Sequence, residues 1–318
     1  MNIIPSTFDE HQINRTVIGG RIENKNASLN ISVILLNNSG GHLKDALFEN
    51  LMECNFRSIV SVELDSNNFS VEDLAKKYPS VKFIVPLEKT TDGEMINLAM
   101  AEVEADYVLV LRNSLDIHPG FIHQNLAERI LKDDVFCVIP RLTDSNKNSI
   151  IEQFIPTVEK KHFAVKESFV VNDGLNTLFS ADNIALYNRK KFIQLGGFDY
   201  AIKSKYWQNL DLGLRSWLWG EETKLTTLLQ FSYIQEPIFD KTINLDYLRF
   251  FLKNGVHKMK NNEAYISNIS FPKFFMNSSC GFLEAKRQFK ATRKWIKQNK
   301  YKIKMDLETL IKNWKAKI

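Results

Sequence analysis

Short apolar runs separated by segments of helical periodicity are the feature that most restricts the fold of this chain. The runs cover residues 31–36, 59–64, 81–87, 107–111 and 135–139. Continuous runs of this length, rich in Val and Ile, are typical of strands buried on both faces of a sheet. Between them apolar residues recur at helical spacing, as at Leu43, Leu47 and Leu51. Strands alternating with helices predict an α/β fold, with a mainly parallel sheet covered by helices.

The second half of the chain predicts a further strand and several helices. Asn188 is suited to cap a short helix that ends at Gly196 and Gly197. We expect a helix over residues 207–219, a strand over 223–233, and helices from residue 246 onward with an interruption near Pro272. A chain of 318 residues accommodates three parts: a loosely ordered polar lead-in (1–29), an α/β domain (30–240) and a helical basic extension (241–318).

Positive charge is concentrated at the C-terminal end. The whole chain carries +5, but from residue 273 onward there are thirteen Lys/Arg and three Asp/Glu, so this tail carries +10 and the rest −5. One hypothesis is that the tail, with its interleaved aromatic residues, lies on an anionic membrane surface. The alternative is that its apolar stripe packs on the protein's own domain or on a second copy, leaving the lysines in water. No nucleic-acid-binding motif accompanies the charge.

The sequence shows neither a leader nor a spanning segment. Residues 1–6 lack the basic start and apolar core of a signal peptide, and the apolar runs are far shorter than a bilayer span. We therefore expect a cytoplasmic protein, with peripheral contact at the inner face of a membrane as the option that the tail offers. Cys54, Cys137 and Cys280 are widely spaced and odd in number, which fits neither a zinc site nor a disulfide framework.

The most specific pattern in the chain lies in residues 196–220. It consists of Gly196-Gly197-Phe198-Asp199, then Tyr206-Trp207, then Asp211-Leu212-Gly213-Leu214-Arg215 and finally Gly220. This order resembles the G-G-F-D-E and W-E-D-x-D-L-x-x-R segments of family 2 glycosyltransferases, which have the GT-A fold. The resemblance covers roughly residues 30–240. It implies an inverting, nucleotide-sugar-dependent glycosyltransferase of polysaccharide or glycoconjugate biosynthesis, with a glycan or lipid-linked acceptor.

The same resemblance implies which side chains form the site. It places Asn38, Glu63 and Asn97 around the nucleotide. Beside the diphosphate it places the segment that contains Arg112, Asn113, Ser114 and Asp116. On the acceptor side it places Asp182, Gly197, Phe198, Asp199 and Trp207, with Asn209 and Asp211 in the region of the catalytic base.

Two departures from the family pattern concern the chemistry itself. The acids of the family's D-x-D motif correspond to Arg112 and Ser114, and a hard divalent cation needs carboxylate oxygens, so we predict no metal site and no cofactor. Arg112 is either a surface residue at a strand end or a guanidinium that pairs with a phosphate in place of the metal. Asp116 is a weaker candidate for a replacement ligand.

The second departure is at the base. Gln208 and Asn209 occupy the family's E-D positions, and an amide cannot accept a proton. Asp211 follows Asn209 by two residues, which turns its side chain by about 200° around a helix. The resemblance implies that the segment containing Asp182 approaches the acceptor. Asp182 is therefore either a carboxylate that replaces the missing base or a solvated surface acid. Three hypotheses therefore stay open: a metal-independent glycosyltransferase, a catalytically inactive relative that binds a glycan or a partner, or a membrane-surface adaptor that acts through the tail.

Overall fold

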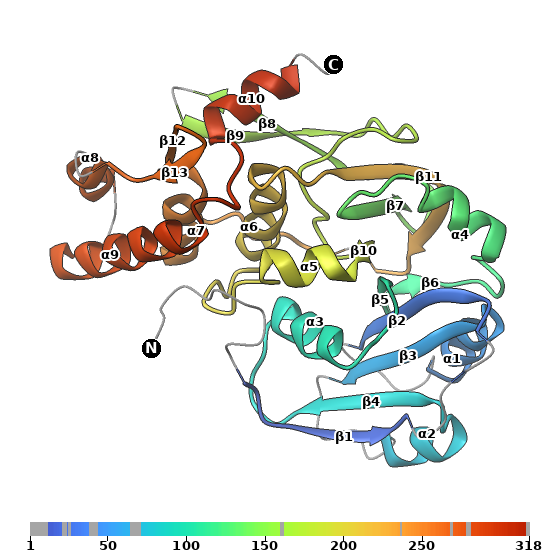
Figure 1. Ribbon diagram of the computed structural model, residues 1–318. Coiled ribbons are helices and arrows are strands. Elements are labelled where there is room, and N and C mark those ends of the chain that lie inside the picture. The colour runs from blue at the N-terminus through green and yellow to red at the C-terminus, as the bar shows by residue number, and fades with distance from the viewer. Residues whose placement is uncertain are drawn as a thin grey trace.

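The protein has a central mixed β-sheet with helices on both faces (Figure 1). The computed structural model describes residues 12–20, 24, 27–37, 44–63, 71–159, 162–235, 237–267, 270–277 and 281–315. Within these ranges nine strands form the sheet, in the order β1-β4-β3-β2-β5-β10-β7-β11-β6. Their bounds are β1 Arg15–Gly19, β2 Leu29–Asn37, β3 Phe56–Glu63, β4 Val81–Pro86, β5 Tyr107–Arg112, β6 Leu115–Asp116, β7 Cys137–Thr143, β10 Ala185–Asn188 and β11 Thr223–Tyr233.

The sheet contains two parallel blocks. Strands β4, β3, β2 and β5 are parallel neighbours, and β7 is parallel to β11. Strand β10 separates the two blocks and is antiparallel to both β5 and β7. The expectation of a mainly parallel α/β sheet is confirmed, with antiparallel strands added between the blocks and at both edges.

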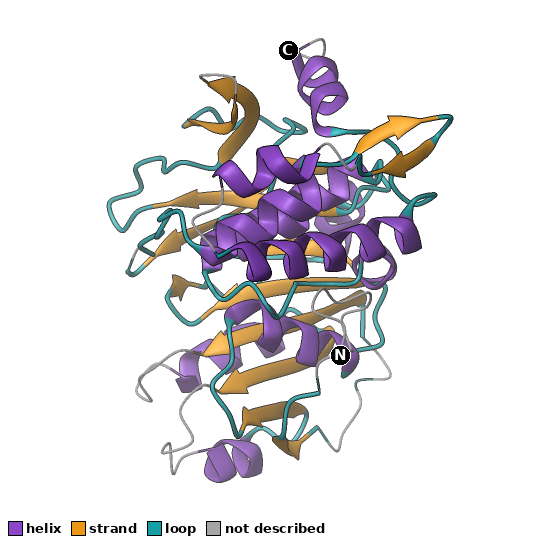
Figure 2. Ribbon diagram, turned by 90° about the vertical axis from the view of Figure 1, so that its left-hand side faces the viewer, coloured by secondary structure: helices purple, strands orange, loops and turns teal. Residues whose placement is uncertain are grey.

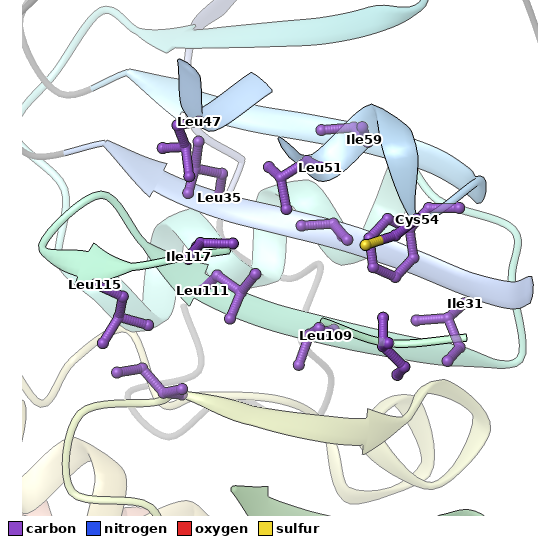
Figure 3. Close-up of a cluster of buried hydrophobic side chains, with 14 of the residues drawn as sticks. Ile31, Leu35, Leu47, Leu51, Cys54, Ile59, Leu109, Leu111, Leu115 and Ile117 are labelled. Atoms are coloured by element: carbon purple, nitrogen blue, oxygen red, sulfur yellow. The ribbon is translucent and has the colours of Figure 1, made fainter. Parts of the chain in front are cut away.

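Both faces of the sheet are apolar because alternate side chains of each central strand point to opposite sides. In β2, Ile31, Val33 and Leu35 belong to one buried cluster and Ile34 and Leu36 to the other. The first cluster is covered by α1 Lys44–Glu53, α2 Val71–Lys77 and α4 Gln124–Ile130, and Figure 3 shows part of it. The second is covered by α3 Asp92–Ala101, α5 Arg189–Leu195 and α6 Lys205–Leu218.

Local sequence signals account for where two of these helices begin and end. Thr91 and Glu94 form a capping box at the start of α3, in which each side chain bonds the other residue's backbone N–H. The Asn188 side chain caps α5 by accepting from the N–H of Lys191, and Gly196 ends the helix at φ 86°. Glycine is favoured there because the left-handed conformation crowds a β-carbon. The predicted cap and stop of this helix are confirmed.

The C-terminal third packs against α6 through α7 and α10. It contains α7 Leu245–Gly255, a hairpin of β12 Lys258–Lys260 and β13 Glu263–Tyr265, and then α8 Ser270–Asn277, α9 Phe282–Asn299 and α10 Leu307–Lys315. A second hairpin, β8 Gln153–Glu159 with β9 His162–Ser168, supports α10. In the part of the chain that the structure describes, no helix combines the length and apolar character needed to cross a membrane.

Two expectations about local structure are wrong. Residues 15–19, predicted to lie in a loosely ordered lead-in, form edge strand β1, whose backbone pairs with β4 while much of its side-chain surface stays exposed. This edge strand lacks an apolar run because its side chains are exposed or only partly buried. The interruption of the C-terminal helices is the β12–β13 hairpin, not Pro272. Pro272 lies in the first turn of α8, where its missing N–H has no helical acceptor.

Candidate functional site

Three polar side chains meet where the adjacent parallel strands β3, β2 and β5 end. Asn37 ends β2, opposite Glu63 at the end of β3, and Asn113 directly follows β5. The Glu63 Oε1 atom accepts from the Asn37 side chain at 3.1 Å and from the Ser61 hydroxyl at 2.7 Å. The Asn113 amide in turn donates to the Asn37 Oδ1 atom at 2.6 Å. Carboxyl ends of parallel strands are where open α/β sheets bind their ligands.

This chain of hydrogen bonds contains two of the residues proposed from the sequence and one that was missed. Glu63 and Asn113 are brought together, whereas Asn38 lies outside the described residues. Asn37 is the missed residue, although it also stands at the end of an apolar run. Asn37 is recognised as a site residue only by its position opposite Glu63 in the β-sheet register, and a single sequence does not show that register.

Arg112 is buried, so the interpretation of Arg112 as a surface residue is wrong. Its side chain is 3% exposed and pairs with the carboxylates of Asp92 and Asp182. The Arg112 Nε atom lies 2.9 Å from the Asp182 carboxylate and also donates to the Asp182 backbone carbonyl at 3.0 Å. Lys205 contacts the same two carboxylates, with its Nζ atom 3.3 Å from Asp92.

This four-residue ion-pair cluster balances its own charge. Burial alone would raise the pKa of the Asp92 carboxyl, but the charges of Arg112 and Lys205 outweigh it and hold that pKa below its usual value. The Tyr233 hydroxyl completes the cluster by donating to Asp182 at 2.9 Å. Asp182, 2% exposed, is therefore not a solvated surface acid. Lys205, 28% exposed, is the cation of the cluster nearest to solvent.

The rest of the D-x-D-like segment has no carboxylate cluster. Ser114 accepts a backbone hydrogen bond from Ile234 at 2.8 Å through its carbonyl. Asp116 is opposite Ser232 in the sheet, and its carboxylate lies 3.4 Å from the Nε2 atom of exposed His118. Among the described side chains no group of three His, Cys, Asp or Glu is arranged to hold a metal ion. A divalent cation does not fit beside Arg112, because the guanidinium would repel it.

The two amides at the base positions are buried and serve the protein's own packing. Gln208 accepts from the backbone N–H of Gly93 at 3.2 Å and donates to the Thr91 hydroxyl at 3.1 Å and the Asp199 carbonyl at 3.0 Å. These bonds hold α6 against the start of α3. A β-carbon on Gly93 would lie 2.5 Å from the Gln208 Oε1 atom, so only glycine allows this approach.

Asn209 differs from Gln208 in having one unpartnered atom. Its amide nitrogen donates to the Ala181 carbonyl at 2.7 Å, while its Oδ1 atom has no hydrogen-bond partner within the described residues. It lines a cavity of about 10 Å³ together with Asn183 and Thr223, whose side-chain polar atoms are also unpartnered there. The Asn209 side chain is thus fixed inside the protein at the position where the resemblance requires a base.

The two acids of the specific sequence pattern lie in a buried ion network behind the site. Asp211 contacts Arg215 at 2.8 Å and Lys253 at 3.0 Å, and accepts from the Asn254 amide at 2.7 Å. Asp199 contacts Arg249 at 3.0 Å and Lys253 at 3.3 Å. Burial would raise the pKa of Asp199, but Lys253 and Arg249 lower it to about 2. The network joins α6 and the segment before it to α7.

The remaining candidates also make internal contacts. Asn97 exchanges two hydrogen bonds with the backbone of Phe198, at 2.9 and 3.0 Å. The Gly197 carbonyl accepts from Arg215 at 2.7 Å. Trp207 is 8% exposed and donates through its indole N–H to the Thr242 carbonyl at 2.9 Å. None of these contacts brings Asn97 or Trp207 into the cluster around Glu63.

Glu152 is a buried acid that sequence reasoning missed, because no motif marks it. It precedes β8, is 3% exposed, and neither carboxylate oxygen has a hydrogen-bond partner in the described structure. Burial raises its pKa to about 8, and the Leu142 N–H and the Arg141 charge offset only part of this effect.

Two larger hollows lie away from these residues: one of about 270 Å³ beside Arg57 and Lys82, and one of about 670 Å³ between α3 and the N-terminal segment. We place the candidate site at the strand ends instead, because that edge carries the convergent polar side chains.

These features define a GT-A-type fold, the fold of a large class of glycosyltransferases. No family model matches the sequence, and no curated protein matches it. The crystal structure of GalNAc-T7 with UDP, GalNAc and Mn²⁺ matches this fold with a TM-score of 0.54 at 12% identity, over 84% of this chain and 56% of that one. The chain thus spans little more than half the length of GalNAc-T7.

Two further solved structures match less closely. The mannosyltransferase PcManGT from Pyrobaculum calidifontis, in complex with GDP-Man and Mn²⁺, has a TM-score of 0.46 at 9% identity, over 97% of this chain and 84% of that one. A mycobacterial protein has a TM-score of 0.45 at 10% identity, over 70% of this chain and 71% of that one.

Proposed function

We propose that this protein binds a nucleotide-activated sugar and is a glycosyltransferase-like protein of polysaccharide or glycoconjugate biosynthesis. The observation that carries the proposal is the hydrogen-bonded set of Asn37, Glu63 and Asn113 at the ends of three adjacent parallel strands. The GalNAc-T7 structure, which has the same fold, contains UDP. A carboxylate flanked by amides offers acceptors for ring N–H groups and ribose hydroxyls, and donors for carbonyl oxygens.

Donor binding in this protein is proposed to be independent of a metal ion. Arg112 and Ser114 stand where a divalent ion would need carboxylates, and Arg112 is already paired. Lys205 is the group that a diphosphate reaches first, since it is the most exposed cation of the cluster. Its ammonium group would exchange part of its contact with Asp92 for a phosphate oxygen.

The test is binding of UDP-sugars and GDP-sugars, measured by thermal shift and calorimetry with manganese and with chelator. A ligand at about a hundred times its dissociation constant should stabilise the fold by about 2.7 kcal/mol, with or without chelator. Glu63→Gln keeps the shape but removes the charge, so it should weaken binding by roughly 10- to 100-fold, the value of a hydrogen bond to a charged group. Glu128→Gln, an exposed acid on α4, is the matched control.

Three results would contradict the proposal. They are the absence of binding with every donor, binding that requires manganese, and equal loss of affinity in the two variants. Manganese dependence in particular would mean that the metal ligands lie among residues that we have not assigned to the site.

A second candidate function is an inactive relative that binds the donor, a glycan or a partner without transferring the sugar. The observation that favours it is the state of Gln208 and Asn209, whose buried amides cannot accept a proton from an acceptor hydroxyl. The test is release of nucleoside diphosphate from each donor that binds, followed by chromatography. An inactive relative releases none above the blank. Release that disappears in Glu63→Gln would establish an active enzyme instead.

A further inference from the structure

Helix α9 divides into one face that packs on the protein and one that is charged and exposed. The buried face contacts α7 and β13 through Ala285, Phe289, Trp295 and Ile296. Trp314 on α10 is buried as well, against Trp217. These aromatic residues of the tail are thus unavailable to a membrane, and the apolar stripe packs on the protein itself.

The exposed face of α9 forms a continuous line of cations, which we call the α9 stripe. It consists of Lys286, Arg287, Lys290, Arg293, Lys294 and Lys297. At 100° per residue these side chains fall within an arc of about 120°, and they span roughly 16 Å along the helix axis. The helix lies on the left-hand side of Figure 1, the side that faces the viewer in Figure 2. All six of these side chains are exposed.

At least half of this positive charge is not neutralised within the part of the chain that the structure describes. Arg287 pairs with Glu284 at 2.5 Å. Lys290, Arg293 and Lys297 have no ion-pair partner among the described residues. Elsewhere the chain is net negative, since residues 273–318 alone carry +10 of a total of +5. The stripe is therefore the place where an anionic surface is attracted.

Apolar side chains extend the stripe at its N-terminal end. Leu283 is 82% exposed and lies in the same arc, one turn before Lys286 and Arg287. Phe282 is 51% exposed and leans edge-on against Phe271 and Phe275. A band of cations along one helix face, with an exposed Leu and Phe at one end, matches a flat layer of anionic headgroups over hydrocarbon. The charges meet the headgroups while the apolar side chains enter the layer.

We propose that the α9 stripe docks the protein on an anionic phospholipid bilayer, with Leu283 and Phe282 inserted at the headgroup boundary. This contact is separate from the donor site at the ends of β2, β3 and β5. The binding is peripheral and sensitive to salt, because exposed charges are screened over about 10 Å at 0.1 M ionic strength.

The test is flotation of the purified full chain with vesicles of phosphatidylglycerol and phosphatidylcholine in equal parts, and with phosphatidylcholine alone. The protein should float with the anionic vesicles only, and less as salt is raised. The variant K290Q/R293Q/K297Q should bind about a hundredfold more weakly, at roughly fivefold for each charge removed. The control K89Q/K132Q/K190Q removes three exposed lysines elsewhere and should bind as the native protein does.

A second variant separates insertion from charge. Leu283→Asn should weaken binding to the anionic vesicles while leaving the melting temperature unchanged, because the side chain is exposed. Binding to neutral vesicles, equal weakening by the control variant, or no flotation at all would overturn the proposal. Tight binding of heparin or duplex DNA that the stripe variant loses, without binding of vesicles, would also overturn it and assign the stripe to a polyanion.

Discussion

Replacing Glu152 with glutamine should abolish a pH dependence of stability that this buried acid imposes. The folded protein holds the Glu152 proton with a pKa of about 8, against 4.5 for an exposed glutamate. The folded state therefore binds more protons than the unfolded chain between these values, and stability falls as pH rises through this window. The contribution of protonated Glu152 to the free energy of unfolding is present in full below pH 4.5 and is lost above pH 8.

The size of the effect follows from the two pKa values. A pKa of 4.5 in the unfolded chain and about 8 in the folded protein corresponds to a loss of about 5 kcal/mol in all. About 3 to 4 kcal/mol of this loss falls between pH 5 and pH 8. The glutamine variant cannot ionise, so its stability relative to the native protein should rise by that amount over the same interval. The new amide N–H groups need partners, which costs about 1–3 kcal/mol at every pH and so leaves the slope unaffected.

The assay is urea unfolding of both proteins from pH 5 to pH 9. Glu159→Gln, which removes an exposed carboxyl from the neighbouring hairpin, controls for the change in net charge. A constant difference between Glu152→Gln and the native protein across this range would refute the reasoning. It would mean that Glu152 is ionised in the folded protein and that the cost of burying its charge is compensated.

Three other substitutions test the packing that holds the site. Gly213→Ala should destabilise by about 1–3 kcal/mol despite the better helix propensity of alanine, because the added carbon would lie 2.3 Å from the Phe179 β-carbon; a rise in melting temperature would contradict this. Asp211→Asn should cost about 3–5 kcal/mol, since it leaves Lys253 short of a buried counter-charge; unchanged urea unfolding would show that Asp199 suffices. Trp314→Ala should cost about 3–5 kcal/mol if α10 belongs to the folded core, as its 4% exposure indicates; loss of α10 protection alone in hydrogen exchange would show that it unfolds separately.

Local patterns in the sequence were sufficient to predict most of the helices and central strands. The runs that became β2 and β4 contain side chains that are apolar on both faces, which only a strand inside a covered sheet requires. Asn188 and Gly196 mark the ends of α5 because capping depends on atoms within a few residues. The strands that were missed include β6, β8, β9 and β10, which are short or partly exposed.

The burial and ion pairing of Arg112 depended on tertiary structure. Its partners Asp92 and Asp182 are 20 and 70 residues away, so no local pattern relates them. The antiparallel register that pairs Ala185 with Val110 places Asp182, just before β10, beside the end of β5.

The sequence by itself determined the class of fold, the absence of carboxylates at the four acid positions of two expected motifs and the excess of positive charge in the tail. Each of these depends on residue identity or on spacing along the chain, which a sequence contains completely. Only the tertiary structure decided which side chains are buried together, such as Asn37 with Glu63 and Arg112 with Asp182. It also decided that the buried Glu152 carboxylate oxygens lack a hydrogen-bond partner among the described residues. It also decided that the cations of α9 stay exposed while Phe289 and Trp295 on the same helix are buried. The reason is that burial and charge pairing are set by distances in space, and strand order brings together residues that are far apart in the chain.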